Sequence, residues 1–288
     1  MHRTRIFIAG AALLALCGAS PFVGAAEDEK PLGWSSTAEF NFVMTAGNSE
    51  STTLGFNSNT ERRWERALLR IKAGALRVDT TSTLGFAVGT GQGDFTVPEV
   101  DATTAENYFL SGQYDRNITE RFFWYAGAGW LRNEFAGIRD RYVASAGVGN
   151  IWYDRPGFSF RTNYGVSYTD QQDVVESPLV DTQYAGLLFT SNLRKTFGKS
   201  KTVYGNDFLA NYSLEDSDNW RWTMEQWLAM SLSERLALKV GLIWLYNNVP
   251  AVSVLELRPA VDQPAIGTVL RQLDELDQIF TVSLVVNF

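Results

Sequence analysis

The last nine residues alternate strictly between apolar and polar positions. Large apolar side chains occupy every second position, at Phe280, Val282, Leu284, Val286 and Phe288. Successive side chains of a strand point to opposite faces, so these five share one face. The other face is mostly polar. A transmembrane strand with lipid outside and a polar lumen inside has this pattern. A sheet covering a soluble core can share it, so the rest of the chain must decide.

The same period-two pattern recurs along the whole chain after residue 33. In residues 157–169, for example, Phe158, Phe160 and Tyr164 alternate with Ser159 and Arg161. Each segment is at least about the 9–11 residues that a tilted membrane strand requires. With the last nine residues as the twelfth, the predicted strands are 34–45, 51–61, 66–78, 105–115, 121–132, 139–153, 157–169, 182–196, 202–213, 220–232 and 236–247.

The connections between these segments are of two kinds. Turns at 62–65, 116–120, 154–157, 198–201 and 233–235 are short, whereas the loops at 79–104, 170–180 and 248–276 are longer. An even number of strands with short turns on one side and longer loops on the other is typical of outer-membrane barrels. We therefore predict an all-β fold, a single antiparallel transmembrane β-barrel of about 12 strands. The orientation of 121–132 and 139–153 stays open, because both faces of the first are apolar and Asn150 fits a lipid face poorly.

The N-terminus has the features of a secretory signal peptide. Arg3 and Arg5 precede an apolar stretch from Ile6 to Leu16, and Gly24-Ala25-Ala26 offers small residues for cleavage. Cys17 suggests a lipoprotein alternative, against which Leu16 stands where a small residue would be expected. The predicted organisation is a signal peptide at 1–26 and a barrel at 27–288. The predicted location, after cleavage, is the outer membrane of a Gram-negative envelope.

Cleavage would remove the single Cys and the single His, Cys17 and His2. Thiolate metal sites and Ser-His-Asp triads would then be excluded from the mature chain. The 23 remaining Lys and Arg residues face 32 Asp and Glu residues, which gives a net charge of −9. This balance disfavours nucleic acid as a partner. We predict neither a cofactor nor a metal site, and no enzyme activity.

Charged residues recur on the face that the alternation assigns to the lumen. Two interpretations stay open: a charged constriction that selects permeating solutes, or a network of ion pairs that fills a narrow barrel. The candidate lumen charges are Glu39, Glu61, Arg70, Lys72, Arg161, Arg194, Arg221, Glu225 and Lys239.

Several motifs resemble a known family. The run Thr45-Ala46-Gly47-Asn48-Ser49 is similar to the first-hairpin signature of the domain-of-unknown-function family named for a salt-induced outer membrane protein. Gln113-Tyr114-Asp115-Arg116, the stretch from Phe135 to Arg141, and the closing Val285-Val286-Asn287-Phe288 are also similar to that family. The resemblance implies an outer-membrane barrel of about twelve strands linked by name to salt or envelope stress, and supplies no catalytic residues. The loop at 251–276 is longer than in the family, and we expect a short helix at about 265–276.

These observations lead to three hypotheses about function. The first is a largely structural or narrow-pore barrel for passive passage of small solutes or ions. The second is a surface-binding barrel with a plugged lumen that acts through its outer loops. The third is a carboxylate-based hydrolase. The expected partners are outer-membrane lipid and, during biogenesis, the barrel-assembly machinery. Phe280, Val282, Leu284, Val286 and Phe288 are the candidate assembly signal; the solute, the trigger and the oligomeric state are left open.

Overall fold

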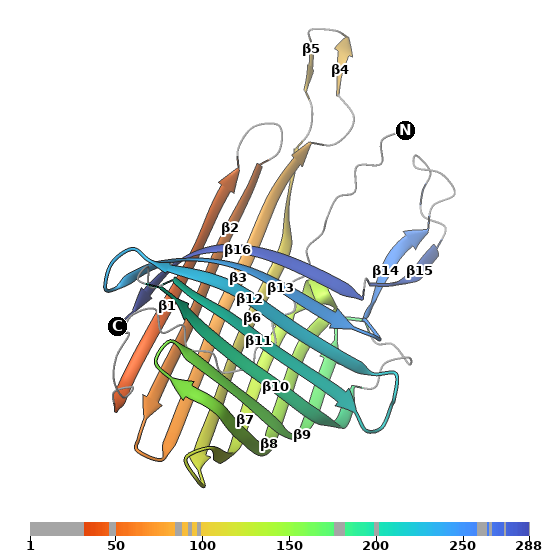
Figure 1. Ribbon diagram of the computed structural model, residues 1–288. Helices are drawn as coiled ribbons and strands as arrows, with labels where there is room; N and C mark the ends of the chain where they lie inside the picture. The colour runs from red at the N-terminus through yellow and green to blue at the C-terminus, as the bar shows by residue number, and fades with distance from the viewer. Residues whose placement is uncertain are drawn as a thin grey trace.

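The computed structural model is a closed antiparallel barrel of twelve strands (Figure 1). It describes residues 32–45, 50–83, 88–91, 94–96, 99–175, 182–198, 202–257, 264, 267–273 and 275–287. The signal peptide, the Gly47-Asn48-Ser49 turn and Phe288 lie outside the described residues. Neighbouring strands around the barrel follow the order β1-β16-β13-β12-β11-β10-β9-β8-β7-β6-β3-β2. The predicted fold class is confirmed.

Each barrel strand is longer than the minimum needed to cross a bilayer, and most extend one of the predicted segments by a few residues. The twelve barrel strands are β1 (Gly33–Thr45), β2 (Glu50–Arg63), β3 (Ala67–Thr83), β6 (Glu99–Asn117), β7 (Phe122–Asn133), β8 (Ile138–Arg155), β9 (Phe158–Asp173), β10 (Gln183–Phe197), β11 (Thr202–Ser213), β12 (Trp220–Ser231), β13 (Leu236–Asn247) and β16 (Leu276–Asn287). A short 3-10 helix, η1 (Glu134–Ala136), connects β7 to β8, and the Asn133 side chain accepts a hydrogen bond from the backbone N–H of Ala136.

Two of the predicted long loops contain regular structure, and here the predictions were wrong. Within 79–104, β3 continues to Thr83, a hairpin of β4 (Val88–Gly91) and β5 (Asp94–Thr96) follows, and β6 already begins at Glu99. The segment 248–276 holds a second hairpin, β14 (Val252–Leu257) with β15 (Gly267–Gln272). The helix expected at 265–276 is therefore a strand, because Gly267–Gln272 forms a ladder with β14. The β4–β5 hairpin stands well beyond the barrel (Figure 1).

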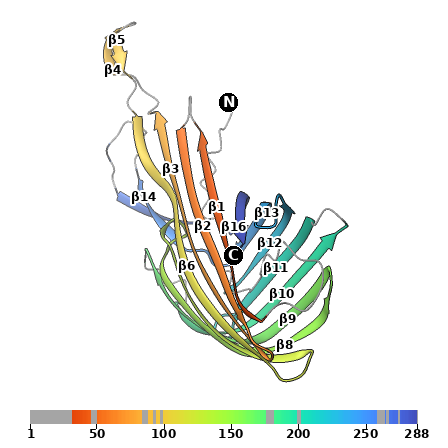
Figure 2. The same ribbon diagram turned by 90° about the vertical axis from the view of Figure 1, so that its left-hand side faces the viewer.

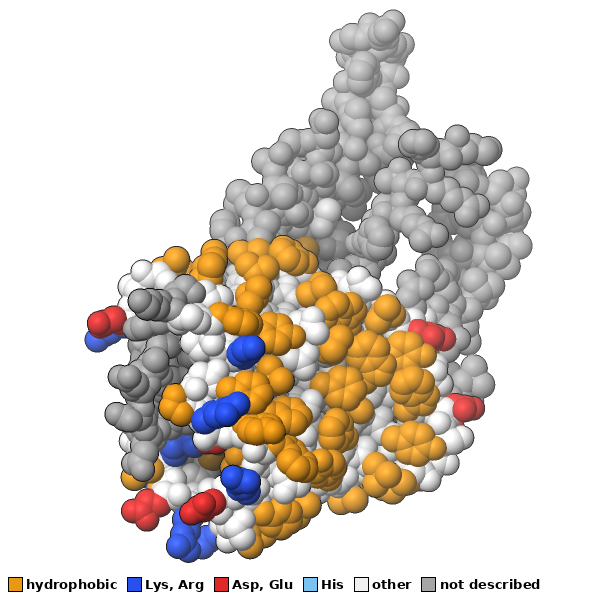
Figure 3. All heavy atoms as spheres, viewed as in Figure 1, with side chains coloured by type: hydrophobic (Ala, Val, Ile, Leu, Met, Phe, Trp, Pro, Cys, Tyr) orange, Lys and Arg blue, Asp and Glu red, His pale blue; other side chains and the backbone are white. Residues whose placement is uncertain are grey.

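The outward face of the barrel is an apolar belt. Figure 3 shows hydrophobic side chains covering most of the face in view, with Lys and Arg gathered near one edge. Phe280 on β16 and Val166 on β9 are 68% and 56% exposed, which would be unfavourable in water over so large an area. Along the belt, aromatic rings contact one another from strand to strand, as in the series Tyr164, Phe189, Phe208, Trp222 and Tyr246.

The structure also settles the orientation of two segments. On β7, Phe123, Tyr125 and Leu131 are almost fully buried inside, whereas Trp124 faces outward. On β8, Arg141 and Val143 are buried and Tyr142 and Val148 are exposed. In Figure 2, β1, β2 and β3 run steeply along one side of the barrel, and β9 to β13 slant across the other.

The belt leads to a testable prediction on β10. Leu187 faces outward in the belt, so Leu187→Arg should lower the free energy of unfolding in vesicles by about 2–4 kcal/mol, since Arg is costly inside the hydrocarbon. Phe197→Arg at the other end of the same strand is the matched control, because the cost near an interface is only about 0–1 kcal/mol. Urea titration of the refolded protein measures both. Equal destabilisation of the two variants would contradict the placement of the belt.

Candidate functional site

All nine charged residues predicted for the lumen lie on inward-facing positions, and the ion pairs among them fall into three groups. Some of the paired residues lie on consecutive strands, as Arg194 and Asp207 do, whereas Lys239 and Glu39 meet only when the barrel closes. Arg221 belongs to none of these ion pairs; it donates to Thr169 Oγ1 at 3.3 Å and its guanidinium lies 5.5 Å from the Tyr184 ring. Whether these residues select solutes stays a prediction.

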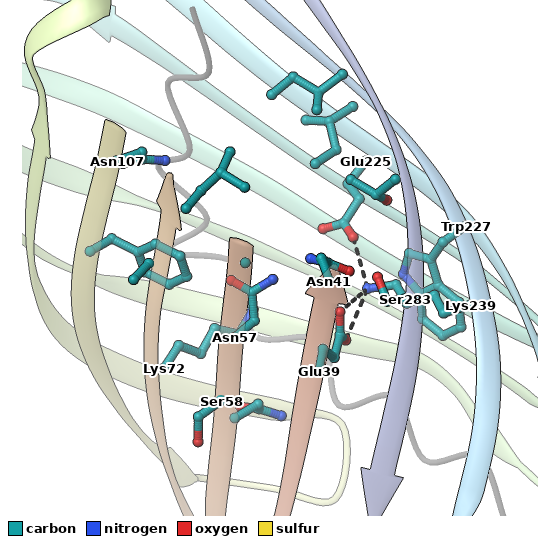
Figure 4. A pocket seen from close by; sticks show the side chains of 18 of the residues that line it. Glu39, Asn41, Asn57, Ser58, Lys72, Asn107, Glu225, Trp227, Lys239 and Ser283 are labelled. Atoms are coloured by element: carbon teal, nitrogen blue, oxygen red, sulfur yellow. Dashed lines mark hydrogen bonds and ion pairs between the residues drawn. The ribbon is translucent and has the colours of Figure 1, made fainter. Parts of the chain in front are cut away.

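The first group is centred on Lys239 of β13. Its Nζ donates to Glu39 Oε1 at 3.1 Å and Oε2 at 3.3 Å on β1, and to Glu225 Oε1 at 3.1 Å on β12 (Figure 4). Lys239 reaches Glu39 across β16, where its paired neighbour is the small Ser283. One ammonium thus connects both carboxylates and links the two ends of the barrel wall.

Trp227 of β12 lies between this group and the second. Its ring is 5.2 Å from Lys239 Nζ and 4.9 Å from the guanidinium carbon of Arg194. The ring packs over Gly205, where a Cβ would meet the indole at 2.1 Å. Cations over an indole face are attracted by its quadrupole, so Gly205 supplies the space in which Trp227 holds both cations.

The second group joins β10 to β11. Arg194 Nη2 contacts Asp207 Oδ1 at 2.8 Å and Oδ2 at 2.6 Å, and Asn192 donates to Asp207 Oδ1 at 2.7 Å. Charge-assisted contacts of this kind hold both partners in a fixed geometry. The Asp207 carboxylate is therefore largely neutralised where it faces the lumen.

The third group lies nearer the short turns. Asp115 of β6 accepts hydrogen bonds from Arg70 of β3 and, at 2.8 Å, from Arg161 of β9; Gln113 donates to its other oxygen at 2.7 Å. The Arg161 guanidinium also lies 4.5 Å from the Phe123 ring. Arg161 thereby connects walls that are not neighbours in the sheet. Glu61, on β2, is buried and lies 3.7 Å from Arg63.

Sequence reasoning missed four inward-facing charges. Asp115 is the last residue of the predicted strand 105–115, directly before the turn at 116–120, and Asp207 lies in the predicted strand 202–213, for which no lumen charge is predicted. Arg141 and Asp173 join through Gln171, which accepts from Arg141 and donates to Asp173 on the outer part of β8 and β9. The alternation itself carried the missing signal, because Asp115 keeps the parity of Gln113 and Asp207 that of Asn211.

A cavity of about 120 Å³ lies inside the barrel beside the first group (Figure 4). Since a water molecule needs roughly 10–15 Å³ of such space, the cavity has room for several. Most of the residues that line it are polar, and its apolar residues include Phe109 and Ile243. The charged and amide side chains of the wall are Glu39, Asn41, Asn57, Asn59, Lys72, Asn107, Asp207, Glu225 and Lys239.

Three amides of this wall have hydrogen-bonding capacity left over. Among the described residues, the side-chain oxygens of Asn41, Asn59 and Asn107 are buried and accept no hydrogen bond. Buried polar atoms without a partner are costly. Water or a polar solute in the cavity would satisfy them, so the wall favours a hydrophilic occupant.

Other chemistry finds little support in the described part of the chain. There, no group of three or more His, Cys, Asp or Glu side chains is arranged to hold a metal ion. Among the same residues, no helix combines the length and the apolar character required to cross a membrane.

Comparison with known proteins gives a family. The family model described as "Protein of unknown function, DUF481" matches residues 38–254, which confirms the resemblance seen in the sequence motifs. The uncharacterized protein YdiY of Escherichia coli (strain K12) is 28% identical over 163 residues, which cover 54% of this chain and 59% of that protein. The match thus spans less than two thirds of the relative.

Several solved barrels are similar in arrangement. The translocator domain of the autotransporter NalP from Neisseria meningitidis has a TM-score of 0.43 and 9% identity, covering 91% of this chain and 90% of that one. An anion-selective porin from Comamonas acidovorans has a TM-score of 0.36 and 12% identity, covering 88% and 98%.

Proposed function

The chain belongs to the DUF481 family of proteins of unknown function, and from the geometry of its barrel we propose that it is an outer-membrane protein with a narrow pore for small hydrophilic solutes or ions. The apolar belt supports the membrane location, because outward apolar side chains are buried in lipid and a barrel pairs most of its backbone N–H and C=O groups between its own strands. The signal peptide predicted from the sequence supports export to the envelope.

The observation that carries the pore is the cavity at the Lys239 group, which has room and hydrogen-bonding groups for water. A narrow lumen passes small solutes when charged side chains of both signs replace part of the solute's hydration shell without binding the solute tightly. Lys239 and Lys72 face Glu39 and Glu225 here, and Asp207 is already paired with Arg194. The local charge is therefore close to balanced, which favours neutral, zwitterionic or weakly bound ionic solutes over strongly charged ones.

Planar-bilayer conductance of the refolded mature chain tests the proposal, after its resistance to SDS without heating shows that it is folded. We expect small, discrete open events. Lys239→Gln should shift the reversal potential in a KCl gradient toward cation selectivity, because it removes a positive charge from the cavity. A unit charge about 8 Å from the path is worth roughly 0.5 kcal/mol in water, about a two-fold change for each ion.

Arg77→Gln is the matched control, because Arg77 is a half-exposed residue that pairs with Asp79 and Thr103 and does not line the cavity. Its reversal potential should equal that of the wild type. If folded Lys239→Gln also keeps the wild-type value, the cavity does not lie in the ion path.

A folded barrel without measurable conductance would contradict the pore and favour the second hypothesis, a surface-binding barrel. The observation behind it is that two of the longer connections form β-hairpins, β4–β5 and β14–β15, instead of irregular loops. Ordered hairpins present a defined surface to a partner. The charged groups of the lumen would then serve stability alone.

A further inference from the structure

The barrel is closed by an unusually short seam. Among the described residues, β1 pairs with β16 at four positions, from Thr37↔Asn287 to Phe40↔Leu284. By comparison, β1 pairs with β2 at thirteen positions and β16 with β13 at eleven. Within this described part of the chain, Asn41–Thr45 therefore has a partner strand on one side only, and so does Leu276–Ser283.

The two strands separate beyond these four pairs. In Figure 1, β1 and β16 run together near the C-terminus; β1 then rises with β2 while β16 crosses with β13, and Figure 2 shows the same divergence from a second direction. The wall is thus split between the outer part of β1 and the first part of β16. The four closing pairs lie at the bottom of this split.

The split can close in the existing register. Continuing the ladder by one residue at a time brings Asn41 opposite Ser283 and Thr45 opposite Ile279. Both strands keep their alternation in this extension, because Asn41 and Ser283 are inward positions that line the same cavity. Nothing in the residue pattern therefore prevents five further pairs from forming.

An open split is costly in a bilayer. Backbone N–H and C=O groups without partners cost several kcal/mol each in hydrocarbon, and exposed strand edges invite new partners. The seam must therefore pair with itself or be occupied. Its occupant must reach a polar cavity from the lipid side.

The cavity behind the split has the chemistry of a polar headgroup site. Thr281, Ser283 and Ile279 of β16 and Asn41 of β1 line it, so the split opens directly into it. Lys72 and Lys239 offer positive charge, and Glu39 and Glu225 negative charge, on its wall. Asn107, only 5% exposed, has a side-chain oxygen that accepts no hydrogen bond within the described structure.

We propose that the β1–β16 seam is a lateral portal through which an amphipathic molecule with a zwitterionic head exchanges between the bilayer and the lumen. The head occupies the cavity, with its anionic part toward the lysines and its cationic part toward the carboxylates. The tail remains in the split, beside the apolar belt. When the portal is empty, the seam pairs further along the same register. The proposal rests on the lumen being the solute path and adds a second entrance to it.

A disulfide across the seam tests the portal. Cleavage at the predicted site leaves no cysteine in the mature chain, so Phe42→Cys with Val282→Cys is the only thiol pair. These two residues are opposite each other in the continued register, on the outward side of the alternation and away from the cavity wall. Residues opposite each other in an antiparallel ladder have Cα atoms about 4.5–5.5 Å apart, within reach of a disulfide. Ala38→Cys with Val286→Cys is the control, because these two residues are already paired.

The readout is native mass spectrometry of the folded variants titrated with diheptanoyl phosphatidylcholine. Reduced Phe42→Cys/Val282→Cys should retain one lipid molecule, and the oxidised form of the same protein should lose it. The control pair should retain the lipid in both states. Failure of the 42/282 disulfide to form, or equal lipid retention in its oxidised and reduced forms, would overturn the portal.

Conductance of the same samples separates the two proposals. Oxidised Phe42→Cys/Val282→Cys should still conduct ions, because this disulfide closes the wall from its outward side and leaves the lumen unchanged. Lipid retention that depends on oxidation, without any ion current, would refute the pore and keep a lipid-binding portal. Ion current with lipid retention unaffected by the disulfide would refute the portal and keep the pore.

Discussion

Asp115→Asn is expected to lower the free energy of unfolding by about 3–5 kcal/mol, the usual cost of removing one partner from a buried ion pair. Asp115 is almost inaccessible and lies between two guanidinium groups, those of Arg70 and Arg161. Without the carboxylate, two like charges face each other in a desolvated place. Urea titration of the refolded barrel, followed by tryptophan fluorescence, measures the change.

Asp79→Asn is the matched control for this variant. Asp79 also pairs with an arginine, Arg77, but both side chains are about half exposed. Exposed ion pairs contribute little to stability, so this variant should unfold at the wild-type urea concentration. If the two variants unfold together, the Asp115 group does not hold the walls of the barrel together.

The second large effect is expected from Gly147→Ala on β8. A Cβ at this position would lie 2.1 Å from the backbone oxygen of Tyr164 and 2.5 Å from the Cα of Gly165. Because these are backbone atoms, no side-chain rotation can relieve the clash, and β8 and β9 must move apart. We expect a loss of about 3 kcal/mol, at the upper end of the usual cost of overpacking.

Gly112→Ala on β6 provides the comparison. There the nearest atom to an added Cβ is the Arg70 backbone oxygen at 3.9 Å, an ordinary contact. This variant should have wild-type stability in the same urea titration. Comparable losses in both variants would mean that strand propensity, and not close approach of β8 to β9, governs the effect.

The barrel itself could be predicted because its signal is local. Period-two alternation assigns each side chain to lipid or lumen without knowledge of its neighbours. The orientation of the segment 121–132 could not be predicted, because aromatic side chains occupy both of its faces. Its inward rings fit only because Gly149 on the neighbouring strand β8 and Gly165 on β9, one strand further, have no side chain. A Cβ at these positions would meet the Phe123 ring and the Tyr125 hydroxyl. These two glycines were the available clue to that orientation.

Most of the charged residues of the lumen could be predicted from the sequence, but not which of them pair with each other. Asp115 meets Arg161 across 46 positions of the sequence, and Lys239 meets Glu39 across 200. Such pairs depend on strand tilt and on how the barrel closes, neither of which alternation determines. The β14–β15 hairpin was not predicted, for another reason. Its irregular polar flanks obscured two short strands that stabilise each other only once paired.

The distance in sequence between Glu39 and Lys239 also bears on the order of events in assembly. Most barrel strands join a neighbour that follows directly in the chain, and such hairpins form with little loss of chain entropy. The first and last strands must instead meet across nearly the whole mature chain. Once the two strands meet, their four described pairs and the contact of Lys239 with Glu39 stabilise the closed barrel. Closure is therefore the late and slow step, since contacts between distant residues limit folding rates. Until it occurs, β1 and β16 are the two free edges of a curved sheet.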